Sequence, residues 1–472
     1  ILNVWTPFPR PHNASVMVFI HGGAFIGGAS GDFVHVAPNF VAVGNVILVT
    51  INYRLSALGF LTTGDGRVKG NLGLYDQRLA MKWVKENIAN FGGNPKSITI
   101  FGISAGGASV SAHTLSKGSW QFFDRAILQS GNMLMPWAIV TDSEMKYGLK
   151  WFLEKVNCTN NENLLKCLRN VTEESWKNAI NDYTDWFQVV TGPYVDGEFF
   201  SDNPQKILEK KAAKNHDIII GITKDEMFVL KQSMLQKSKN ISDYLKHFEG
   251  TLEAHFKNSP KAVYEKAREL YKPKCIPSYL EALKPSVAFD SDIMFICASR
   301  QEAKLRSKLM NGSNVYLYQY SHTPLVPYIA FLYPYGLFGF SAHGLDTVST
   351  FGQPINNTKF RPEDQTLSMR MILYWTNFAK TGNPNVGTRK LPIVVGNVDS
   401  LPTWPKYTYS KDEFLDMDSF SQMTVKTKLR ETQCEFLKDP QGFLEKVTSA
   451  STRHIITTLT WFIMIVIYVT FV

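Results

Sequence analysis

Short apolar runs rich in β-branched residues alternate with longer, helix-like stretches along the chain. These runs are almost continuously hydrophobic, which is typical of strands buried on both faces of a parallel sheet. Six runs are predicted as strands: Ser15–Ile20, Asn45–Ile51, Ser97–Phe101, Arg125–Leu128, Asp217–Gly221 and Val315–Tyr320. A helix is predicted from Leu72 to Asn90, and the Gly92-Gly93 pair ends it. The pattern predicts an α/β fold, with a mostly parallel central sheet flanked by helices.

No internal repeat or low-complexity linker divides the chain, so one catalytic domain is predicted over residues 1–454. Hydrophobic residues make up 44% of the chain and charged residues 19%, which excludes a disordered protein. The 50 Lys and Arg exceed the 41 Asp and Glu and leave a net charge of +9, but like charges do not cluster in runs. A nucleic-acid partner is therefore not expected.

The last 18 residues, Ile455–Val472, carry no charge and approach the minimum length of a membrane span. We expect them to anchor the protein as a retained single span. Two alternatives stay open: a cleaved GPI signal after Ser449-Ala450-Ser451, and a buried segment. Six N-x-S/T sequons are candidate glycosylation sites: Asn13, Asn157, Asn170, Asn240, Asn311 and Asn356. Together these features predict the secretory pathway, with the catalytic domain extracellular or lumenal.

The chain opens in what is predicted to be the middle of a strand, at Ile1 to Trp5, without an initiator Met or a charged leader. We expect it to be truncated at its front. Its five cysteines are too few for a disulfide scaffold, and none forms a C-x-x-C pair. No metal and no cofactor is predicted.

The strongest chemical signal is the segment Gly-Ile-Ser-Ala-Gly around Ser104, which directly follows the predicted strand Ser97–Phe101. Gly-x-Ser-x-Gly between a strand and a helix is typical of a nucleophile elbow. Gly102 and Gly106 leave room for a turn too tight for side chains, and the serine hydroxyl is lifted clear of the sheet. The Ala105 amide at the start of the next helix favours negative charge, as an acyl-transfer oxyanion requires.

A glycine-rich loop beginning at His21 and Gly22 follows the predicted strand Ser15–Ile20. Esterases place an HGGG-type loop at this point, where its N–H groups stabilise the oxyanion. A glycine-rich turn in which His21 only packs is the alternative.

A serine nucleophile needs a base and a carboxylate, which in this fold follow it in the order Ser, Asp/Glu, His. His343 lies in a loop beyond the last predicted strand, and His322, directly after Val315–Tyr320, is its rival. For the carboxylate, Asp225 and Glu226 both follow a predicted strand, and the residues alone do not separate them.

Six blocks in order resemble the type-B carboxylesterase/cholinesterase family. They are LNVWTP (2–7), VFIHGGAFIGG (18–28), NYRLSALGFL (52–61), GNLGLYDQRLAMKWVKENIANFGGNP (70–95), FGISAGGASV (101–110) and QSGNMLMPW (129–137). Four later segments extend the resemblance to nearly the whole chain before the tail: PYVDGEFF (193–200), GITKDEMF (221–228), AHGLD (342–346) and YWTNFAKTGNPN (374–385). The resemblance implies an α/β-hydrolase fold and a serine carboxylesterase acting on a small carboxylic ester.

The same resemblance implies the roles of individual residues. Ser104 is the nucleophile, Glu226 the acid and His343 the base. The implied oxyanion donors are the amides of Gly23, Ala24 and Ala105, with alanine at position 24 where glycine is usual. Cys158 and Cys167 resemble a small disulfide loop of the family, while Cys275, Cys297 and Cys434 have no assignment.

One residue departs from the family pattern. Ile103 stands where a glutamate usually precedes the serine. In cholinesterases that glutamate lies near the cationic substrate head, so its loss favours an uncharged ester. The alternatives are a choline-ester hydrolase and an adhesion-type homologue without activity, and the sequence predicts no oligomeric state.

Overall fold

The computed structural model describes residues 1–32, 35, 37–159, 163–181, 191–272, 275–309, 312–324, 339–387, 401–418 and 423–446. The chain forms two compact units. The first comprises residues 1–233 and 294–429, and the second residues 234–293 and 430–472, of which 430–446 are described. The predicted domain boundary at residue 454 lies outside the described residues.

A nine-stranded sheet runs through the first unit in the order β1-β3-β2-β4-β5-β6-β7-β8-β9. Its strands are β1 (Leu2–Trp5), β2 (Ala14–Ile20), β3 (Ile47–Ile51), β4 (Gly93–Ile103), β5 (Arg125–Gln129), β6 (Asp217–Thr223), β7 (Val315–Tyr320), β8 (Glu413–Met417) and β9 (Thr424–Thr427). The seven strands from β3 across to β8 are parallel, and the edge strands β1 and β9 are antiparallel. This is the mostly parallel sheet that the apolar runs predicted.

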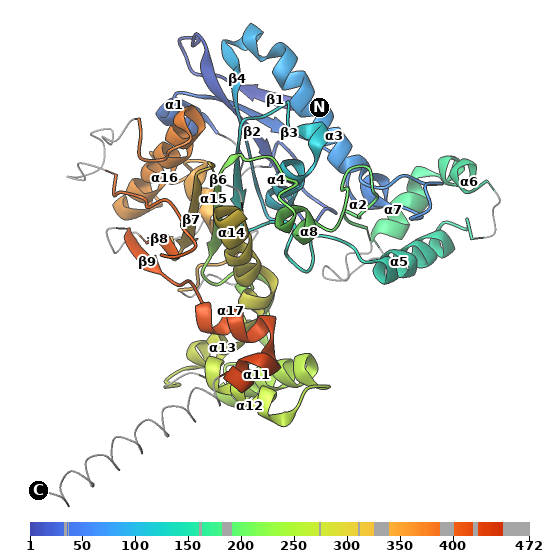
Figure 1. The fold of residues 1–472 in the computed structure, drawn as a ribbon, viewed down its shortest axis with the longest axis vertical. Helices are drawn as coiled ribbons and strands as arrows, with labels where there is room; N and C mark the ends of the chain where they lie inside the picture. Colours follow the sequence, from blue (N-terminus) through green and yellow to red (C-terminus); the bar gives the residue numbers. More distant parts are fainter. Residues whose placement is uncertain are drawn as a thin grey trace, which may run out of the picture. The chain divides into compact units, whose positions relative to one another are not determined.

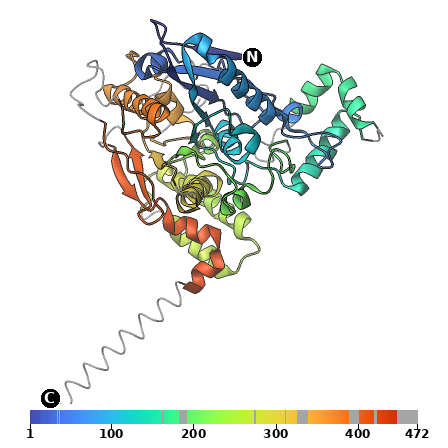
Figure 2. The ribbon, with the colours of Figure 1, turned by 45° about the horizontal axis from the view of Figure 1, so that its top comes forward.

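Helices cover both faces of this sheet, so its central strands are buried on both sides. The α-helices of this unit are α1 (Pro38–Gly44), α2 (Ser56–Phe60), α3 (Leu72–Asn87), α4 (Ala105–Leu115), α5 (Asp142–Lys155), α6 (Leu164–Asn170), α7 (Glu173–Asn181), α8 (Pro204–Glu209), α9 (Phe228–Lys231), α14 (Cys297–Leu309), α15 (Leu345–Thr350) and α16 (Pro362–Thr381). Figure 1 shows α1 and α16 on one side of the strands, with α3 and α4 on the other. In Figure 2 the orange α16 and the blue α3 again lie on opposite sides.

Alternate side chains of β2 show how the sequence builds these layers. Val18 and Ile20 belong to the same buried core as Leu74 of α3. Phe19 points to the other face, where its ring lies 4.8 Å from that of Phe351. Since successive side chains of a strand point to opposite faces, a continuous apolar run is what this two-sided burial requires.

The second unit is helical and contains α10 (Met234–Lys237), α11 (Ile241–Phe256), α12 (Lys261–Tyr271), α13 (Tyr279–Ser291) and α17 (Glu431–Lys438). Aromatic side chains such as Phe256, Phe289 and Phe436 form its core. A buried carboxylate, Asp292, pairs with Arg430 at 2.5 Å and accepts a hydrogen bond from the Tyr271 hydroxyl.

Candidate active site

Ser104 occupies the turn between β4, which ends at Ile103, and α4, which begins at Ala105. Its backbone angles, φ 58° and ψ −125°, are strained for a residue with a side chain. The two glycines at positions 102 and 106 explain how this turn fits. A Cβ on Gly102 would lie 2.6 Å from the Ile20 carbonyl oxygen, and a Cβ on Gly106 would lie 2.0 Å from the same atom. Only glycine is therefore tolerated on either side.

The glycine-rich loop packs directly against this turn. A Cβ on Gly22 would lie 3.0 Å from the Cβ of Ser104. Gly23, Ala24 and Phe25 all have positive φ values, of 109°, 53° and 62°. Such angles in non-glycine residues are uncommon and mark a specifically shaped backbone.

Three hydrogen bonds fix the loop in this shape. The amides of Ile26 and Gly27 both donate to the Gly23 carbonyl at 2.9 Å, and the Tyr53 hydroxyl donates to the His21 carbonyl at 2.9 Å. The His21 ring is stacked on Tyr53, and burial lowers its pKa, which keeps the imidazole neutral. His21 therefore packs beneath the loop.

Three amides of the glycine-rich loop and of the first turn of α4 have no acceptor among the described residues: those of Gly23, Ala24 and Ala105. The Ala105 amide is also the first of α4, where the helix dipole adds positive potential. These are the amides that the sequence resemblance implied as oxyanion donors. Unpaired amides of this kind favour an anionic oxygen.

Glu226 and His343 lie together after the ends of neighbouring strands. Glu226 is fully buried, and its Oε2 atom lies 2.5 Å from His343 Nδ1. Its Oε1 atom accepts hydrogen bonds from the Ser130 hydroxyl at 2.6 Å and from the Thr223 amide at 2.7 Å. The carboxylate is thus held on both oxygens, while the imidazole keeps 19% of its side chain exposed. His343 can reach a bound molecule, and Glu226 cannot.

Asp225, the rival carboxylate, has a different contact. Its Oδ2 atom accepts from the Ser341 amide at 2.9 Å, and its own amide donates to the Ser341 carbonyl at 2.9 Å. Asp225 and Ala342 form a parallel β-bridge. Asp225 therefore holds the loop that carries His343.

His322, the rival base, is fully buried. Its Nε2 atom lies 2.6 Å from Asp364 Oδ1, and Arg361 also binds that carboxylate at 3.1 Å. The hydrogen bonds of Asp364 lower its pKa to about 2 against the effect of burial, so it is a carboxylate at neutral pH. His322 is part of a buried polar cluster with Asp364 and Arg361.

The end of β5 connects the serine with the carboxylate. The Ser104 amide donates to the Gln129 carbonyl at 2.8 Å, and the next residue, Ser130, donates to Glu226. Because β4, β5, β6 and β7 are adjacent and parallel, the residues after their carboxyl ends meet at one edge of the sheet. Sequence reasoning gave no role to Ser130, although its place directly after a predicted strand was a usable signal.

Aromatic side chains border the histidine. The Phe295 ring lies 4.9 Å from the His343 ring, and the Trp137 ring lies 5.5 Å from Phe295. Ile103, the residue before the serine, is 7% exposed. Phe295 and Trp137 therefore place apolar surface beside His343.

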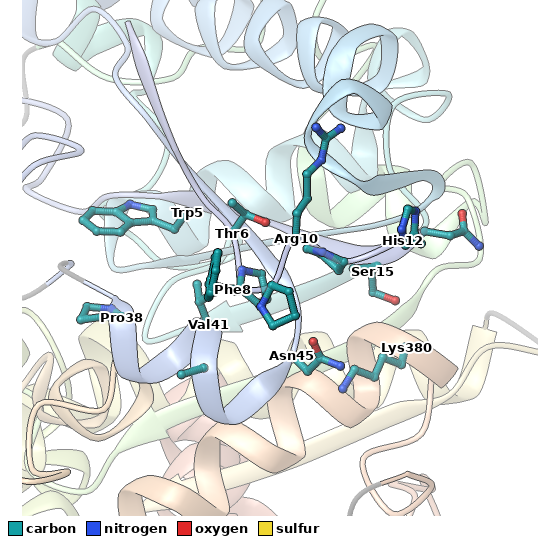
Figure 3. A pocket seen from close by; sticks show the side chains of 16 residues that line it. Trp5, Thr6, Phe8, Arg10, His12, Ser15, Pro38, Val41, Asn45 and Lys380 are labelled. Atoms are coloured by element: carbon teal, nitrogen blue, oxygen red, sulfur yellow. The ribbon is translucent and has the colours of Figure 1, made fainter.

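A surface hollow of about 940 Å³ lies elsewhere in this unit (Figure 3). Trp5, Arg10 and Lys380 contribute to its wall. It also includes Ala14, the first residue of β2, and therefore lies at the amino end of the parallel strands. Ser104 follows the carboxyl end of β4, so the hollow is separate from the Ser104 site.

Cys158 and Cys167 form a disulfide with 2.04 Å between their sulfurs, the pairing that the resemblance implied. Cys297 and Cys434 are also disulfide-bonded, and Cys275 is exposed and reduced. The asparagines of five sequons are exposed: Asn13, Asn157, Asn170, Asn240 and Asn356. The sixth, Asn311, lies outside the described residues.

The described ranges contain no cluster of three His, Cys, Asp or Glu side chains arranged to hold a metal ion. No helix within them combines the length and the apolar character needed to cross a membrane. The predicted anchor, residues 455–472, lies outside these ranges.

Comparisons with known proteins bear on this site. Residues 1–437 match the profile of the "Carboxylesterase family". The chain is 33% identical over 471 residues to "Acetylcholinesterase" from Bungarus fasciatus, which covers 95% of this chain and 72% of that protein. It is 33% identical to "Cholinesterase" from Mus musculus, over 92% of this chain and 71% of that protein. "Bile salt-activated lipase" from Bos taurus is also 33% identical, over 95% of this chain and 76% of that protein.

Proposed function

Because this chain belongs to the carboxylesterase family, we propose that it is a serine esterase that hydrolyses carboxylic esters through an acyl intermediate on Ser104. The main support is the 2.5 Å contact between Glu226 and His343, beside a serine in a strained strand-to-helix turn. This combination of a nucleophile, a base and an orienting carboxylate is what acyl transfer to a hydroxyl requires.

In the proposed mechanism, Ser104 Oγ attacks the ester carbonyl while His343 Nε2 accepts the hydroxyl proton. Glu226 binds Nδ1, so the imidazole proton stays on Nδ1 and Nε2 is available as the base. The imidazolium that forms is stabilised by the buried carboxylate, and it returns its proton to the leaving alcohol. Water then attacks the acyl-enzyme by the same steps.

The tetrahedral intermediate places a negative charge on the former carbonyl oxygen. The amides of Gly23, Ala24 and Ala105 stabilise this charge in the proposal, since none has another acceptor among the described residues. Preorganised donors of this kind contribute about 3 to 4 kcal/mol each to the lowering of the barrier.

The proposed substrate is an uncharged carboxylic ester. Ile103 places an apolar side chain next to Ser104, and Phe295 and Trp137 add aromatic surface near His343. The relatives include proteins named as cholinesterases and a lipase, so the family accommodates different esters. Ile103, in place of a carboxylate that could attract a cationic head, favours the neutral ester.

The decisive experiment uses Ser104→Ala. Removal of a triad member typically lowers the rate by about 10⁴ to 10⁶-fold, and Ser104 is only partly buried, so loss of one oxygen should leave no cavity. A fluorophosphonate probe should label the parent at Ser104 and leave the variant unlabelled, as located by mass spectrometry. Ester hydrolysis within tenfold of the parent, at equal thermal stability, would exclude Ser104 as the nucleophile.

The proposed location is the secretory pathway, with residues 455–472 as a membrane anchor. The Cys158–Cys167 disulfide fits an oxidising compartment, and the exposed sequons are open to glycosylation. Treatment of expressing cells with phosphatidylinositol-specific phospholipase C should leave activity on the membrane, and detergent should release it. Release of activity by the phospholipase would indicate a GPI anchor. Activity in the soluble fraction without either treatment would indicate that residues 455–472 are no anchor.

A further inference from the structure

Gln129, the last residue of β5, contacts both sides of the proposed active site. Its backbone carbonyl accepts the Ser104 amide at 2.8 Å. Its side chain, which is fully buried, donates from Nε2 to Asp346 Oδ2 at 3.0 Å. Trp375 Nε1 donates to its Oε1 atom at 3.3 Å and so fixes the orientation of the amide. One residue therefore holds the nucleophile turn through its backbone and Asp346 through its side chain.

Asp346 lies three residues after His343, in the first turn of α15. It is fully buried, and its Oδ2 atom also accepts a hydrogen bond from the Tyr318 hydroxyl at 2.6 Å. Burial raises the pKa of this carboxyl group, whereas the hydrogen bonds from Tyr318 and Gln129 oppose the rise. A buried carboxyl group is costly unless it is hydrogen-bonded, so this arrangement calls for an explanation.

Glu226 alone does not fix the base. The hydrogen bond at Nδ1 orients the imidazole ring, and Asp225 holds the loop on the amino side of His343. A second anchor is needed between the loop and the nucleophile turn, because misplacement of reacting groups by about 1 Å can lower the rate about 10²-fold. The contacts of Asp346 provide such an anchor on the carboxyl side of His343.

On the basis of the proposed function, we propose that Asp346 is a positioning residue, joined by Gln129 and Tyr318, which sets the position of His343 relative to Ser104. Asp346 acts by fixing the position of His343, since Asp346 is buried and does not contact the substrate or the reacting atoms. The acceptor oxygen is the essential feature. Asparagine keeps that oxygen and both hydrogen bonds, and leucine keeps neither.

The test compares two substitutions that each remove one buried tyrosine hydroxyl from an aspartate. Tyr318→Phe removes the donor to Asp346, whereas Tyr407→Phe removes the donor to Asp412, a buried carboxylate paired with Arg300. Both phenol rings are buried, so the two changes should cost similar stability. Only Tyr318→Phe should lower kcat, by about five- to tenfold at unchanged KM.

Substitutions at Asp346 separate position from charge. Asp346→Leu should lower kcat and the fluorophosphonate labelling rate of Ser104 by about 10 to 100-fold, and Asp346→Asn should stay within about threefold of the parent. If Asp346→Leu does not fold, Tyr318→Phe decides.

Three results would overturn the inference: unchanged kcat in Tyr318→Phe, equal losses in the asparagine and leucine variants, or an equal loss in Tyr407→Phe. Any of these with an inactive Ser104→Ala leaves the proposed function in place. An active Ser104→Ala would instead remove the proposed function itself.

Discussion

His343 and His322 each bind a carboxylate through a ring nitrogen, at 2.5 Å and 2.6 Å respectively. Contact with a carboxylate alone therefore does not identify a catalytic base. Their accessibility differs, because 19% of the His343 side chain is exposed and none of the His322 side chain is. A base must reach the substrate, so the two residues should differ in function.

We expect His343→Ala to lower the acylation rate by about 10⁴-fold or more, as other triad removals do. His322→Ala should lower thermal stability, because it leaves Asp364 buried without this partner, yet the remaining folded enzyme should keep its turnover number. Burst kinetics per folded molecule separate the two effects. An inactive His322→Ala together with an active His343→Ala would assign the catalytic base to His322 instead.

The two carboxylates that the sequence left open allow a matched comparison. Glu226→Gln should abolish acylation, since the amide cannot stabilise the imidazolium. Asp225→Asn keeps an oxygen that can accept from the Ser341 amide, so its effect should be below about tenfold. Both rates are read from single-turnover hydrolysis of a chromogenic ester. Equal losses would contradict the separate roles.

Ile103 gives a prediction on substrate charge. A carboxylate about 4 Å from a cationic head contributes about 4 kcal/mol at an effective dielectric near 20, before desolvation is subtracted. A third of this is about tenfold in rate. The test is the ratio of kcat/KM for butyrylcholine to kcat/KM for its neutral isostere, 3,3-dimethylbutyl butyrate. The parent should show no strong preference for the cation, and Ile103→Glu should raise this ratio about tenfold. A parent that strongly prefers the cation would refute the uncharged-ester proposal.

Sequence reasoning at the residue scale could propose only groups with a strong local signal. Ser104 was proposed as the nucleophile because glycines on both sides and a preceding strand leave few other interpretations. Gln129 and Asp346 were given no role, because their contact joins residues 217 positions apart. No local pattern encodes such a pair, and only the folded chain brings its members together.

At the scale of the element, the strand-turn-helix around Ser104 is limited by backbone contact. Gly106 and Gly250 are both helical glycines, so alanine at either should add about 0.5 to 1 kcal/mol of stability from propensity alone. A Cβ at position 250 meets nothing within 4 Å, whereas at position 106 it lies 2.0 Å from the Ile20 carbonyl oxygen. The backbone there cannot give way as a flexible side chain would.

Gly250→Ala should therefore stabilise the protein, and Gly106→Ala should destabilise it by about 1 to 3 kcal/mol, as overpacking does. The displaced turn should also slow fluorophosphonate labelling of Ser104. Denaturant unfolding and labelling rates, measured on both variants, test the two claims. A stabilised and fully reactive Gly106→Ala would contradict the packing argument.

The same scale shows which strands the sequence could predict. The buried strands from β2 to β7 have nearly continuous apolar runs, and their predicted positions match those in the structure to within a few residues. The last two strands of the sheet, β8 and the edge strand β9, were not predicted. β9 is exposed at all four positions, and β8 contains two acidic residues, so neither has a continuous apolar pattern. Their pairing depends on the sheet being already formed.

At the scale of the whole molecule, buried neutral histidines determine the response to acid. Burial lowers the pKa of His113 and of His216 to about 3, and Lys214 and Arg306 lower that of His216 further. The unfolded histidine binds a proton below about pH 6.5, and the folded one only near pH 3. Protons therefore favour the unfolded state throughout this window, and stability falls as the pH falls.

His216 is the better one to test, because neither ring nitrogen makes a hydrogen bond among the described residues and its ring is stacked on Phe123. His216→Phe should keep the stacking and reduce the loss of stability between pH 6 and pH 4 by up to about 1.4 kcal/mol per pH unit. The exposed His12→Gln serves as the control and should leave the slope unchanged. Urea unfolding at pH 6 and pH 4 measures the change in the free energy of unfolding with pH. An unaltered change in His216→Phe would contradict the titration argument.

The short backbone bridge between Asp225 and Ala342 has a consequence for how this chain can change over time. It joins the segments that carry Glu226 and His343, although 117 positions separate the two residues. The long segment between them, which includes α10 to α13, begins and ends beside this bridge. Lengthening an exposed loop within this segment, such as residues 257–260 between α11 and α12, costs only loop-closure entropy, about 0.6 kcal/mol for each doubling. Insertions in such loops can therefore accumulate without altering the spacing of Glu226 and His343.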